Sequence, residues 1–424
     1  MKYYLGIDTG TTSISMAALS ESRELIASRT FNHNAFITGD SPSNRLQDPE
    51  RIKSNVFYFL DSLTSELGQP SAIGFTGQMH GILYVNASGE AVSPLYTWQD
   101  TTGDDSLALL REHGLSVSSG YGLATHFSLQ RAGKIPSEAV RLSTISDYIA
   151  MSLCGKTEPV LSPDMAASWG CFDLERREFM RGKLEEAGVD VSYLPEVLRG
   201  YEVIGTTKAG VPVVCSIGDN QASLKGAVKD EANSLLVNVG TGSQVSFATG
   251  EYVSVSGDVE LRPYGDGYVL AGSALCGGRA YAMLERFYRE VAGRECYGLM
   301  ASQAEEFLRG GGVAWEVDTR FAGTRSDPTK RGSVRGISEE NFCPGAFTVG
   351  VIRGILGELY WFYETMKGLT GREARVVVGS GNGMRKNPLM QRIAGEVFGM
   401  EVEIPEFTEE AACGAGLCAM GVVG

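Results

Sequence analysis

Four short polar loops follow apolar runs of the chain, and their residue types can bind phosphate or move a proton. They comprise residues 8–13, 218–220, 240–243 and 379–383. In layered α/β proteins, ligands bind beyond the ends of strands, where loops meet helix N-termini. Glycine, threonine and serine in such a loop offer unpaired N–H groups and hydroxyls without bulky side chains, which suits a polyphosphate.

Asp8 precedes the first of these loops. An aspartate beside a phosphate-binding turn can hold Mg²⁺ through water, because magnesium keeps several waters. The alternative is an aspartate that stabilises its own turn. A matching turn recurs at residues 240–243, and two such hairpins can bind one triphosphate from opposite sides. The recurrence favours the phosphate interpretation.

Asp219 ends an apolar run, residues 211–217, that predicts a strand. A helix-like stretch of small residues, 222–227, follows. A carboxylate at this junction can accept the proton of an attacking hydroxyl, which is the base role in phosphoryl transfer. It can equally cap the helix, and the residues alone leave both readings open.

The glycines at 379, 381 and 383 do not form a dinucleotide fingerprint, because Met384 stands where the third glycine is needed. A loop lying against an adenosine and a plain turn remain as alternatives.

Another group of residues suits a sugar: Gln78, Met79, His80, Trp98 and Asp100. Carbonyl and planar groups hydrogen-bond hydroxyls, while an aromatic ring covers the apolar face of a carbon chain. A purely structural role for His80 is the alternative.

The elements around these loops alternate between strand and helix patterns. Apolar runs flank residues 8–13, as in a β-hairpin. Asp48-Pro49 opens a helix that Gly68 ends. Because the strand–turn–strand pattern recurs past the middle of the chain, we expect two α/β domains with related cores, residues 1–228 and 229–424.

The composition is that of an ordinary globular protein of 424 residues with a net charge of −14. An acidic surface argues against nucleic acid or an anionic membrane as partner. The eight cysteines are scattered without metal-ligand spacing, and no apolar run is long enough to cross a bilayer or serve as a signal peptide. We therefore expect a cytoplasmic protein with reduced thiols.

Together these motifs resemble those of the FGGY carbohydrate kinases, in the actin–hexokinase superfamily. The segments that carry the resemblance are LGIDTGTTSIS (5–15), TGQMHG (76–81), TWQD (97–100), SIGDNQAS (216–223), LVNVGTGSQ (236–244), GSGNGMRKNPLMQRIAGEVFG (379–399) and EEAACGAG (409–416). They follow in family order across nearly the whole chain.

The resemblance implies two ribonuclease-H-like domains with a cleft between them, ATP and Mg²⁺ as cofactors, and a small sugar as substrate. By motif, Asp8 corresponds to the metal-linked aspartate and Asp219 to the general base. Phosphate contacts correspond to Thr11, Thr12, Ser13, Gly240 and Thr241; adenosine contacts to Gly379, Ser380, Gly381 and Asn387; and sugar contacts to Met79, His80, Trp98, Asp219 and Asn220. Gln78 and Asp100 join the sugar group from the reading above.

Within the family, TGQMHG is shared by xylulokinases and sedoheptulokinases, whereas TWQD and the helix after Asn387 look more like sedoheptulokinase. A ketose is therefore the expected substrate, sedoheptulose ahead of xylulose and ribulose, with other polyols as alternatives. An ATPase switch acting on a protein partner and an inactive sugar-binding regulator are further alternatives. The oligomeric state stays open, with a homodimer as one alternative.

Overall fold

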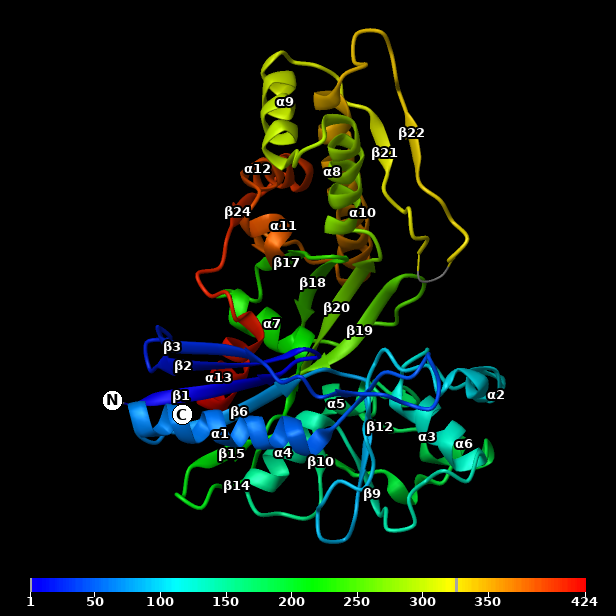
Figure 1. Cartoon of the computed structure of the whole chain (residues 1–424), viewed down its shortest axis with the longest axis vertical. Coiled ribbons are helices and arrows are strands. Elements are labelled where there is room, and N and C mark those ends of the chain that lie inside the picture. The colour runs from blue at the N-terminus through cyan, green and yellow to red at the C-terminus, as the bar shows by residue number, and fades with distance from the viewer. Residues whose placement is uncertain (1, 325–326) are drawn as a thin grey trace. The chain divides into compact units, whose positions relative to one another are not determined.

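The computed structural model describes residues 2–324 and 327–424, and the chain forms two compact units. Unit 1 comprises Met1–Gly226, Pro263–Asp266 and Phe407–Gly424, and unit 2 comprises Ala227–Arg262 and Gly267–Glu406. The predicted division at residue 228 was linear along the chain. The structure instead packs the C-terminal helix α13 (Glu410–Val423) within unit 1 (Figure 1).

A mixed sheet forms the centre of unit 1, in the order β14-β15-β6-β1-β2-β3, with β16 also paired to β6. Its strands are β1 (Tyr3–Thr9), β2 (Ser13–Ser20), β3 (Leu25–Asn32), β6 (Ala72–Gly77), β14 (Val203–Thr206), β15 (Pro212–Val214) and β16 (Ile217–Gly218). Strand β6 runs parallel to both β1 and β16. The carboxyl ends of these three strands therefore lie at one edge, from which the loops after residues 9, 77 and 218 begin.

The side chains of β1 alternate between the two faces of this sheet, as the pleat requires. Tyr3, Leu5 and Ile7 enter a core shared with α1 (Pro49–Leu67) and α4 (Ile145–Leu153). Gly6 lies on the other face, where a Cβ would come within 1.8 Å of the carbonyl oxygen of Ala412 in α13. Only glycine permits this approach, and Asp8 lies on the same face two residues on.

Helix α1 follows its sequence pattern. The Asp48 carboxylate accepts hydrogen bonds from the N–H groups of Glu50 and Arg51, Pro49 occupies the first turn, and Gly68 ends the helix. Its apolar side chains Ile52, Val56, Leu60 and Leu63 are buried. The prediction of this helix is confirmed.

The predicted single strand at residues 211–217 is wrong in one respect, because the structure splits it into β15 and β16. The two residues between them direct their N–H groups elsewhere: Cys215 donates to the Glu202 carbonyl and Ser216 to the Asp147 carboxylate. Helix α7 (Asp219–Ala227) then begins at Asp219 itself.

The remaining elements of unit 1 surround a second apolar cluster that includes Met79, Tyr84, Phe127 and Trp169. The helices are α2 (Leu107–Glu112), α3 (Gly122–Arg131), α5 (Pro163–Ala167) and α6 (Arg181–Glu186), with short 3-10 turns at Asp104–Ser106 and Val191–Tyr193. The short strands are β4 (Phe36–Ile37), β5 (Leu46–Gln47), β7 (Leu83–Val85), β8 (Leu95–Tyr96), β9 (Arg141–Ser143), β10 (Val160–Leu161), β11 (Phe172–Asp173), β12 (Glu178–Phe179) and β13 (Glu196–Val197).

Unit 2 repeats the central arrangement of unit 1, in the strand order β19-β20-β18-β17-β23-β24. These strands are β17 (Ser234–Val239), β18 (Ser243–Thr249), β19 (Val259–Tyr264), β20 (Gly267–Ala274), β23 (Val376–Ser380) and β24 (Glu401–Glu403). Strand β17 is antiparallel to β18 and parallel to β23, as β1 is to β2 and β6. The predicted related cores are therefore present.

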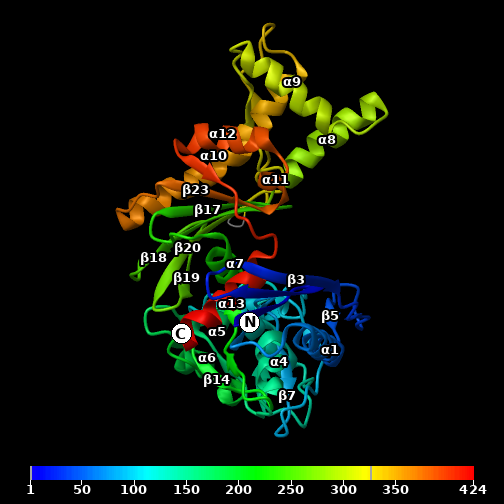
Figure 2. The same ribbon diagram turned by 90° about the vertical axis from the view of Figure 1, so that its left-hand side faces the viewer.

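Helices cover the unit 2 sheet (Figure 2). They are α8 (Gly278–Ala292), α9 (Tyr297–Arg309), α10 (Pro344–Thr370), α11 (Gly381–Arg385) and α12 (Pro388–Phe398), and a small ribbon of β21 (Glu316–Asp318) and β22 (Ser333–Arg335) lies beside α10. Helix α10 packs closely on the sheet, since a Cβ at Gly272 would come within 2.4 Å of the Phe362 ring.

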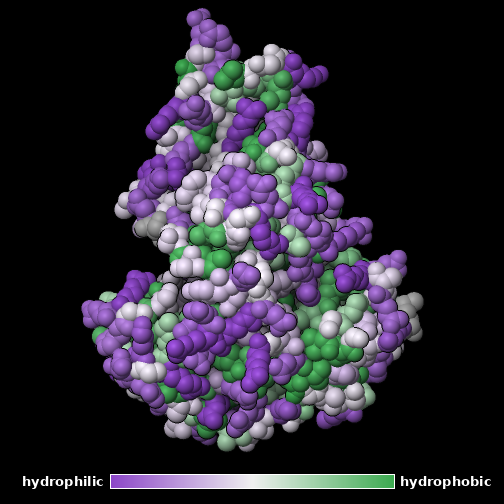
Figure 3. All heavy atoms as spheres, turned by 180° about the vertical axis from the view of Figure 1, so that it is seen from behind, coloured by the Kyte–Doolittle hydropathy of each residue, from purple (hydrophilic) through white to green (hydrophobic). Residues whose placement is uncertain are grey.

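Polar side chains cover most of the face shown in Figure 3. Over the described parts of the chain, no helix is both long enough and apolar enough to span a bilayer.

Candidate active site

The loop between β1 and β2 has its carbonyl oxygens held by two buried side chains that the sequence reasoning missed. The Nε2 of His33 lies 3.3 and 3.1 Å from the carbonyl oxygens of Gly10 and Thr11, and Gln47 Nε2 donates to the Thr11 carbonyl at 2.6 Å. Ala35 N–H donates to His33 Nδ1, so Nε2 carries the proton. Burial lowers the pKa of His33, which keeps the ring neutral near pH 7.

Because the carbonyl oxygens of this loop already accept hydrogen bonds from His33 and Gln47, the groups it presents to a ligand are N–H and hydroxyl donors. Thr11, Thr12 and Ser13 are partly or fully exposed. Among the described residues, no backbone acceptor takes the N–H of Thr11 or Thr12. Free N–H groups beside hydroxyls form an anion-binding concavity.

Asp8 directly precedes this loop and carries a desolvated carboxylate. Its Oδ1 is buried and has no hydrogen-bond partner in the described structure. Burial, together with the negative charges of Asp219 and Glu409, raises the pKa of Asp8 to about 7. Asp219 and Glu409 are thus near enough to Asp8 to repel the charge of its carboxylate.

This carboxylate group fits a divalent cation, which would relieve the repulsion. Within the ranges that the structure covers, no three His, Cys, Asp or Glu side chains form a complete metal-ligand set. Mg²⁺ commonly binds through one or two carboxylates, several waters and the phosphates of a substrate.

Asp219 stands at the junction of β16 and α7, and a buried carboxylate holds the residue before it. Asp164 Oδ2 accepts hydrogen bonds from Gly218 N at 2.7 Å and from the Tyr201 hydroxyl at 3.1 Å, while Ser162 donates to Oδ1. Asp164 is 1% exposed, and burial raises its pKa. The sequence reasoning missed Asp164, since no spacing signal links it to Asp219.

Two predicted sugar contacts have buried oxygens without a partner in the described chain, Gln78 Oε1 and Asn220 Oδ1. The amide nitrogen of Gln78 donates to Gln47 Oε1 at 2.8 Å, which fixes the orientation of its oxygen. Met79 is buried against Gly218, where a Cβ would meet its sulfur at 2.7 Å.

His80 has an unusual backbone for a residue with a side chain, at φ +73°. Its Nδ1 lies 2.6 Å from the carbonyl oxygen of Ser168, so Nδ1 carries the proton and, in the neutral ring, Nε2 is an acceptor. The ring stacks on Tyr121 at 4.5 Å. The loop conformation is therefore held by contacts on both sides of the imidazole.

Trp98 and Asp100 share a loop but differ in their surroundings. Trp98 is 46% exposed, and its Nε1 donates to the Thr11 hydroxyl at 3.0 Å. The Asp100 carboxylate is fully buried and accepts hydrogen bonds from Arg45 N, Asn44 Nδ2 and Thr102 N. In this structure Asp100 is engaged with protein groups that shape the loop.

In unit 2, Gly240 and Thr241 lie in the loop between β17 and β18, beside a hollow of about 370 Å³. Their carbonyls accept hydrogen bonds from the first N–H groups of α8, Gly278 N at 2.8 Å and Arg279 N at 3.0 Å. The loop of unit 1 is similar, because its carbonyl oxygens also accept hydrogen bonds from protein groups, there the side chains of His33 and Gln47.

The loop after β23 packs against β17 in the same unit. Ser380 is buried, and its hydroxyl accepts a hydrogen bond from Asn238 at 2.8 Å. Gly381 has φ +76°, and a Cβ there would lie 2.6 Å from the Val239 carbonyl oxygen. A Cβ at Gly379 would likewise meet Met384 at 2.7 Å. These glycines keep the loop beside the end of β17.

Asn387 caps α12, with its Oδ1 accepting a hydrogen bond from Met390 N at 3.1 Å. Its side chain also lies near the Tyr281 hydroxyl of α8. The predicted residues thus form two groups: one at the carboxyl edge of the unit 1 sheet, and one where β17, β23 and α8 meet in unit 2.

Comparison with known proteins adds independent findings. Residues 3–226 match the N-terminal domain of the FGGY family of carbohydrate kinases, and residues 235–421 match its C-terminal domain. The chain is 29% identical to sedoheptulokinase of Mus musculus over 469 residues, covering 97% of this chain and 96% of the relative. It is 27% identical to the Homo sapiens sedoheptulokinase with the same coverage.

Solved structures share the fold. Xylulose kinase from Rhodospirillum rubrum matches with a TM-score of 0.85 at 19% identity, over 99% of this chain and 89% of that chain. Glycerol kinase from Plasmodium falciparum, solved with ADP, matches with a TM-score of 0.84 at 18% identity and equal coverage. Because both family domains match in order over most of its length, this chain belongs to the FGGY family of carbohydrate kinases, enzymes that transfer a phosphoryl group from ATP to a sugar.

Proposed function

We propose that this kinase phosphorylates a primary hydroxyl of a ketose, converting sedoheptulose to sedoheptulose 7-phosphate, with Asp219 as the general base. The two sedoheptulokinases aligned over 97% of the chain support this substrate ahead of the alternatives. Xylulose is the second candidate, since the Escherichia coli xylulose kinase is 25% identical over 58% of this chain. The eight cysteines are free thiols, which suits a reducing cytoplasm.

One observation carries the proposal. Asp8, Gln78 and Asn220 each have a buried side-chain oxygen with no partner in the described chain. Asp8 lies near the carboxyl end of β1, and Gln78 and Asn220 follow β6 and β16, which end at the same edge of the unit 1 sheet. Unpaired buried acceptors destabilise a fold unless a ligand supplies donors. The hydroxyls of a sugar are such donors for the two amide oxygens, and a cation suits the carboxylate.

In the proposed mechanism, Gln78, His80 and Asn220 orient the sugar while Trp98 covers its carbon chain. Asp219 accepts the proton of the attacking hydroxyl as the sugar oxygen bonds to the γ-phosphorus of ATP, while the bond from that phosphorus to the bridging oxygen breaks and ADP leaves. The hydroxyls of Thr11, Thr12 and Ser13 and the N–H groups of Thr11 and Thr12 bind the phosphates, and we assign Gly240 and Thr241 to the phosphates as well.

Gly379, Ser380, Gly381 and Asn387 shape the loop that we assign to the nucleoside. Mg²⁺ held beside Asp8, when bound, would offset the negative charge of the phosphates. Met79 packs on Gly218 and Asp100 holds the Trp98 loop, so we assign both of them positioning roles in the sugar site.

A coupled assay of ADP release over ketoses and polyols of three to seven carbons tests the proposal. We expect the highest kcat/KM with sedoheptulose, and NMR of the product should show the phosphate on carbon 7. A higher kcat/KM with xylulose or ribulose would transfer the assignment to a pentulose. ADP release that no sugar stimulates would refute the kinase assignment and favour an ATPase switch or a regulator.

A further inference from the structure

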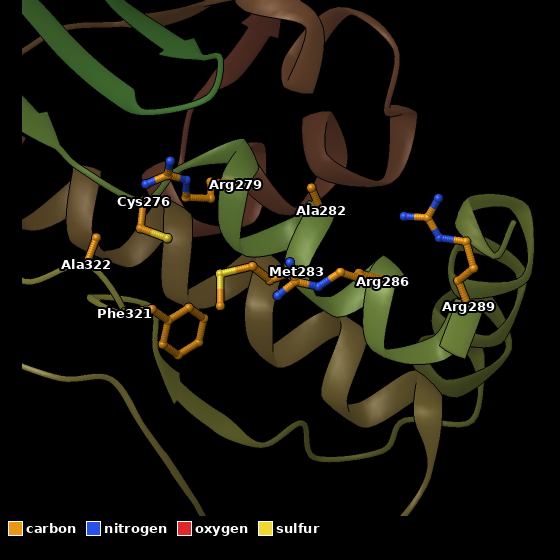
Figure 4. Close-up of a pocket in the computed structure, with 8 residues that line it drawn as sticks. All are labelled: Cys276, Arg279, Ala282, Met283, Arg286, Arg289, Phe321 and Ala322. Carbon is orange, nitrogen blue, oxygen red and sulfur yellow. The ribbon is translucent and has the colours of Figure 1, made fainter. Parts of the chain in front are cut away.

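A pocket of about 500 Å³ runs along one face of α8 in unit 2 (Figure 4). Its polar lining consists of Arg279, Arg286 and Arg289, and Met283 and Phe321 contribute apolar surface. In Figure 4 the side chains of Arg279, Met283 and Arg286 extend from α8 toward the side that carries Phe321.

The charge of this pocket is opposite to that of the protein. The chain carries a net charge of −14, yet three guanidinium groups line one pocket. Arg289 pairs with the buried Glu285 at 3.1 Å. Arg279 and Arg286 are exposed, and neither forms an ion pair with another described residue. Two uncompensated cations thus remain beside apolar surface.

The backbone of Arg279 is hydrogen-bonded to the loop that we assign to phosphate binding. Its N–H donates to the Thr241 carbonyl at 3.0 Å, and the preceding N–H, of Gly278, donates to the Gly240 carbonyl at 2.8 Å. The position in the first turn of α8 is unfavourable for a cation, because the positive end of the helix dipole lies there. A bound anion would reverse that penalty.

We propose that Arg279 binds the phosphate chain of the donor nucleotide, while Arg286 adds longer-range attraction from two turns farther along the same face of α8. The inference rests on the proposed use of ATP at the Gly240–Thr241 loop. A guanidinium group binds phosphate oxygens through paired N–H donors. No sequence motif singled out this residue, because its role depends on the contact between α8 and the loop.

Isothermal titration with ADP and with adenosine tests the inference on the full-length protein. Arg279→Gln should weaken ADP binding about 10-fold to 100-fold, the range for a charge-assisted hydrogen bond, and leave adenosine binding unchanged. Arg279→Lys should recover part of the loss, and Arg286→Gln should weaken ADP binding less than Arg279→Gln. Arg309→Gln is the matched control, because Arg309 is an exposed arginine of α9 outside the pocket.

Two results would overturn the inference: ADP binding to Arg279→Gln as tight as to the wild type, or an equal loss of ADP and adenosine binding. Either can occur while the wild type still phosphorylates its sugar, in which case only the role of Arg279 fails. A wild type that binds no ADP and transfers no phosphate would instead remove the proposed function itself.

Discussion

The indole N–H of Trp98 donates a 3.0 Å hydrogen bond to the hydroxyl of Thr11. This contact joins a residue assigned to the sugar with the loop assigned to phosphate. A sugar seated against the indole would therefore influence the geometry of the phosphate loop.

A double-mutant cycle measures this coupling. Trp98→Phe keeps an aromatic face but loses the donor, and Thr11→Val keeps the shape but loses the hydroxyl. We expect the two losses in kcat/KM to be non-additive by about 0.5–1.5 kcal/mol, the net value of one hydrogen bond. Strictly additive losses would show that the two residues act independently.

Asp164 should act as a positioning residue for Asp219, because its carboxylate accepts the Gly218 N–H at 2.7 Å. Asp164→Ala should lower kcat by roughly 10-fold to 100-fold, as expected when a catalytic group shifts by about 1 Å, and leave the KM for ATP unchanged. Asp164→Asn, which keeps one acceptor oxygen, should retain more activity than alanine. Steady-state kinetics in which both variants match the wild-type kcat would contradict the role.

Asp8→Asn should separate activity from stability. The variant loses the carboxylate assigned to the cation, so the Mg²⁺ concentration for half-maximal activity should rise on the order of 10-fold.

Burial and the charges of Asp219 and Glu409 raise the pKa of Asp8 to about 7, so at pH 8 the wild type holds an unfavourable buried charge. Without Mg²⁺ at that pH, the variant should unfold at a higher temperature than the wild type. A lower unfolding temperature would argue against this reading of the carboxylates.

His126 predicts a pH dependence of stability that is unrelated to catalysis. The buried ring lies 2.7 Å from the Tyr84 hydroxyl and 3.1 Å from the Asp190 carbonyl, and burial lowers its pKa to about 4. The unfolded chain, with a histidine pKa of about 6.5, binds the proton more readily. The contribution of His126 to stability is therefore complete above pH 6.5 and is lost as the pH falls toward 4.

Urea unfolding at pH 7.5 and pH 5.0 checks this prediction. The linkage relation gives a loss of about 2 kcal/mol from His126 by pH 5. His126→Gln cannot titrate, so its stability should fall by about 2 kcal/mol less than that of the wild type over the same range. Equal losses in the two proteins would show that His126 is not responsible.

Local patterns were predictable from the sequence. Asp48 and Gly68 cap the two ends of α1, and Asn387 and Gly399 cap the two ends of α12. Such caps are predictable because they act over only a few residues. The repeated strand–turn–strand segments also have the predicted pairing, since apolar runs flanking a glycine-containing turn favour a hairpin.

Contacts between distant segments were not predictable. His33, Gln47 and Asp164 hold backbone groups far along the chain, and nothing in their own neighbourhoods marks that role. The placement of α13 in unit 1 follows from Gly6, Gly74 and Gly226, where a Cβ would collide with its backbone. The small residues of this helix permit tight packing, but they do not identify the strands against which it packs.

The most direct test concerns Asp219. Asp219→Asn removes the proton acceptor while conserving size, and Asp104→Asn, at an exposed position of the same unit, is the matched control. With the best sugar, kcat of Asp219→Asn should fall on the order of 100-fold or more, while its ADP affinity and the activity of Asp104→Asn stay at wild-type values. A near-normal kcat for Asp219→Asn would show that another group takes the proton.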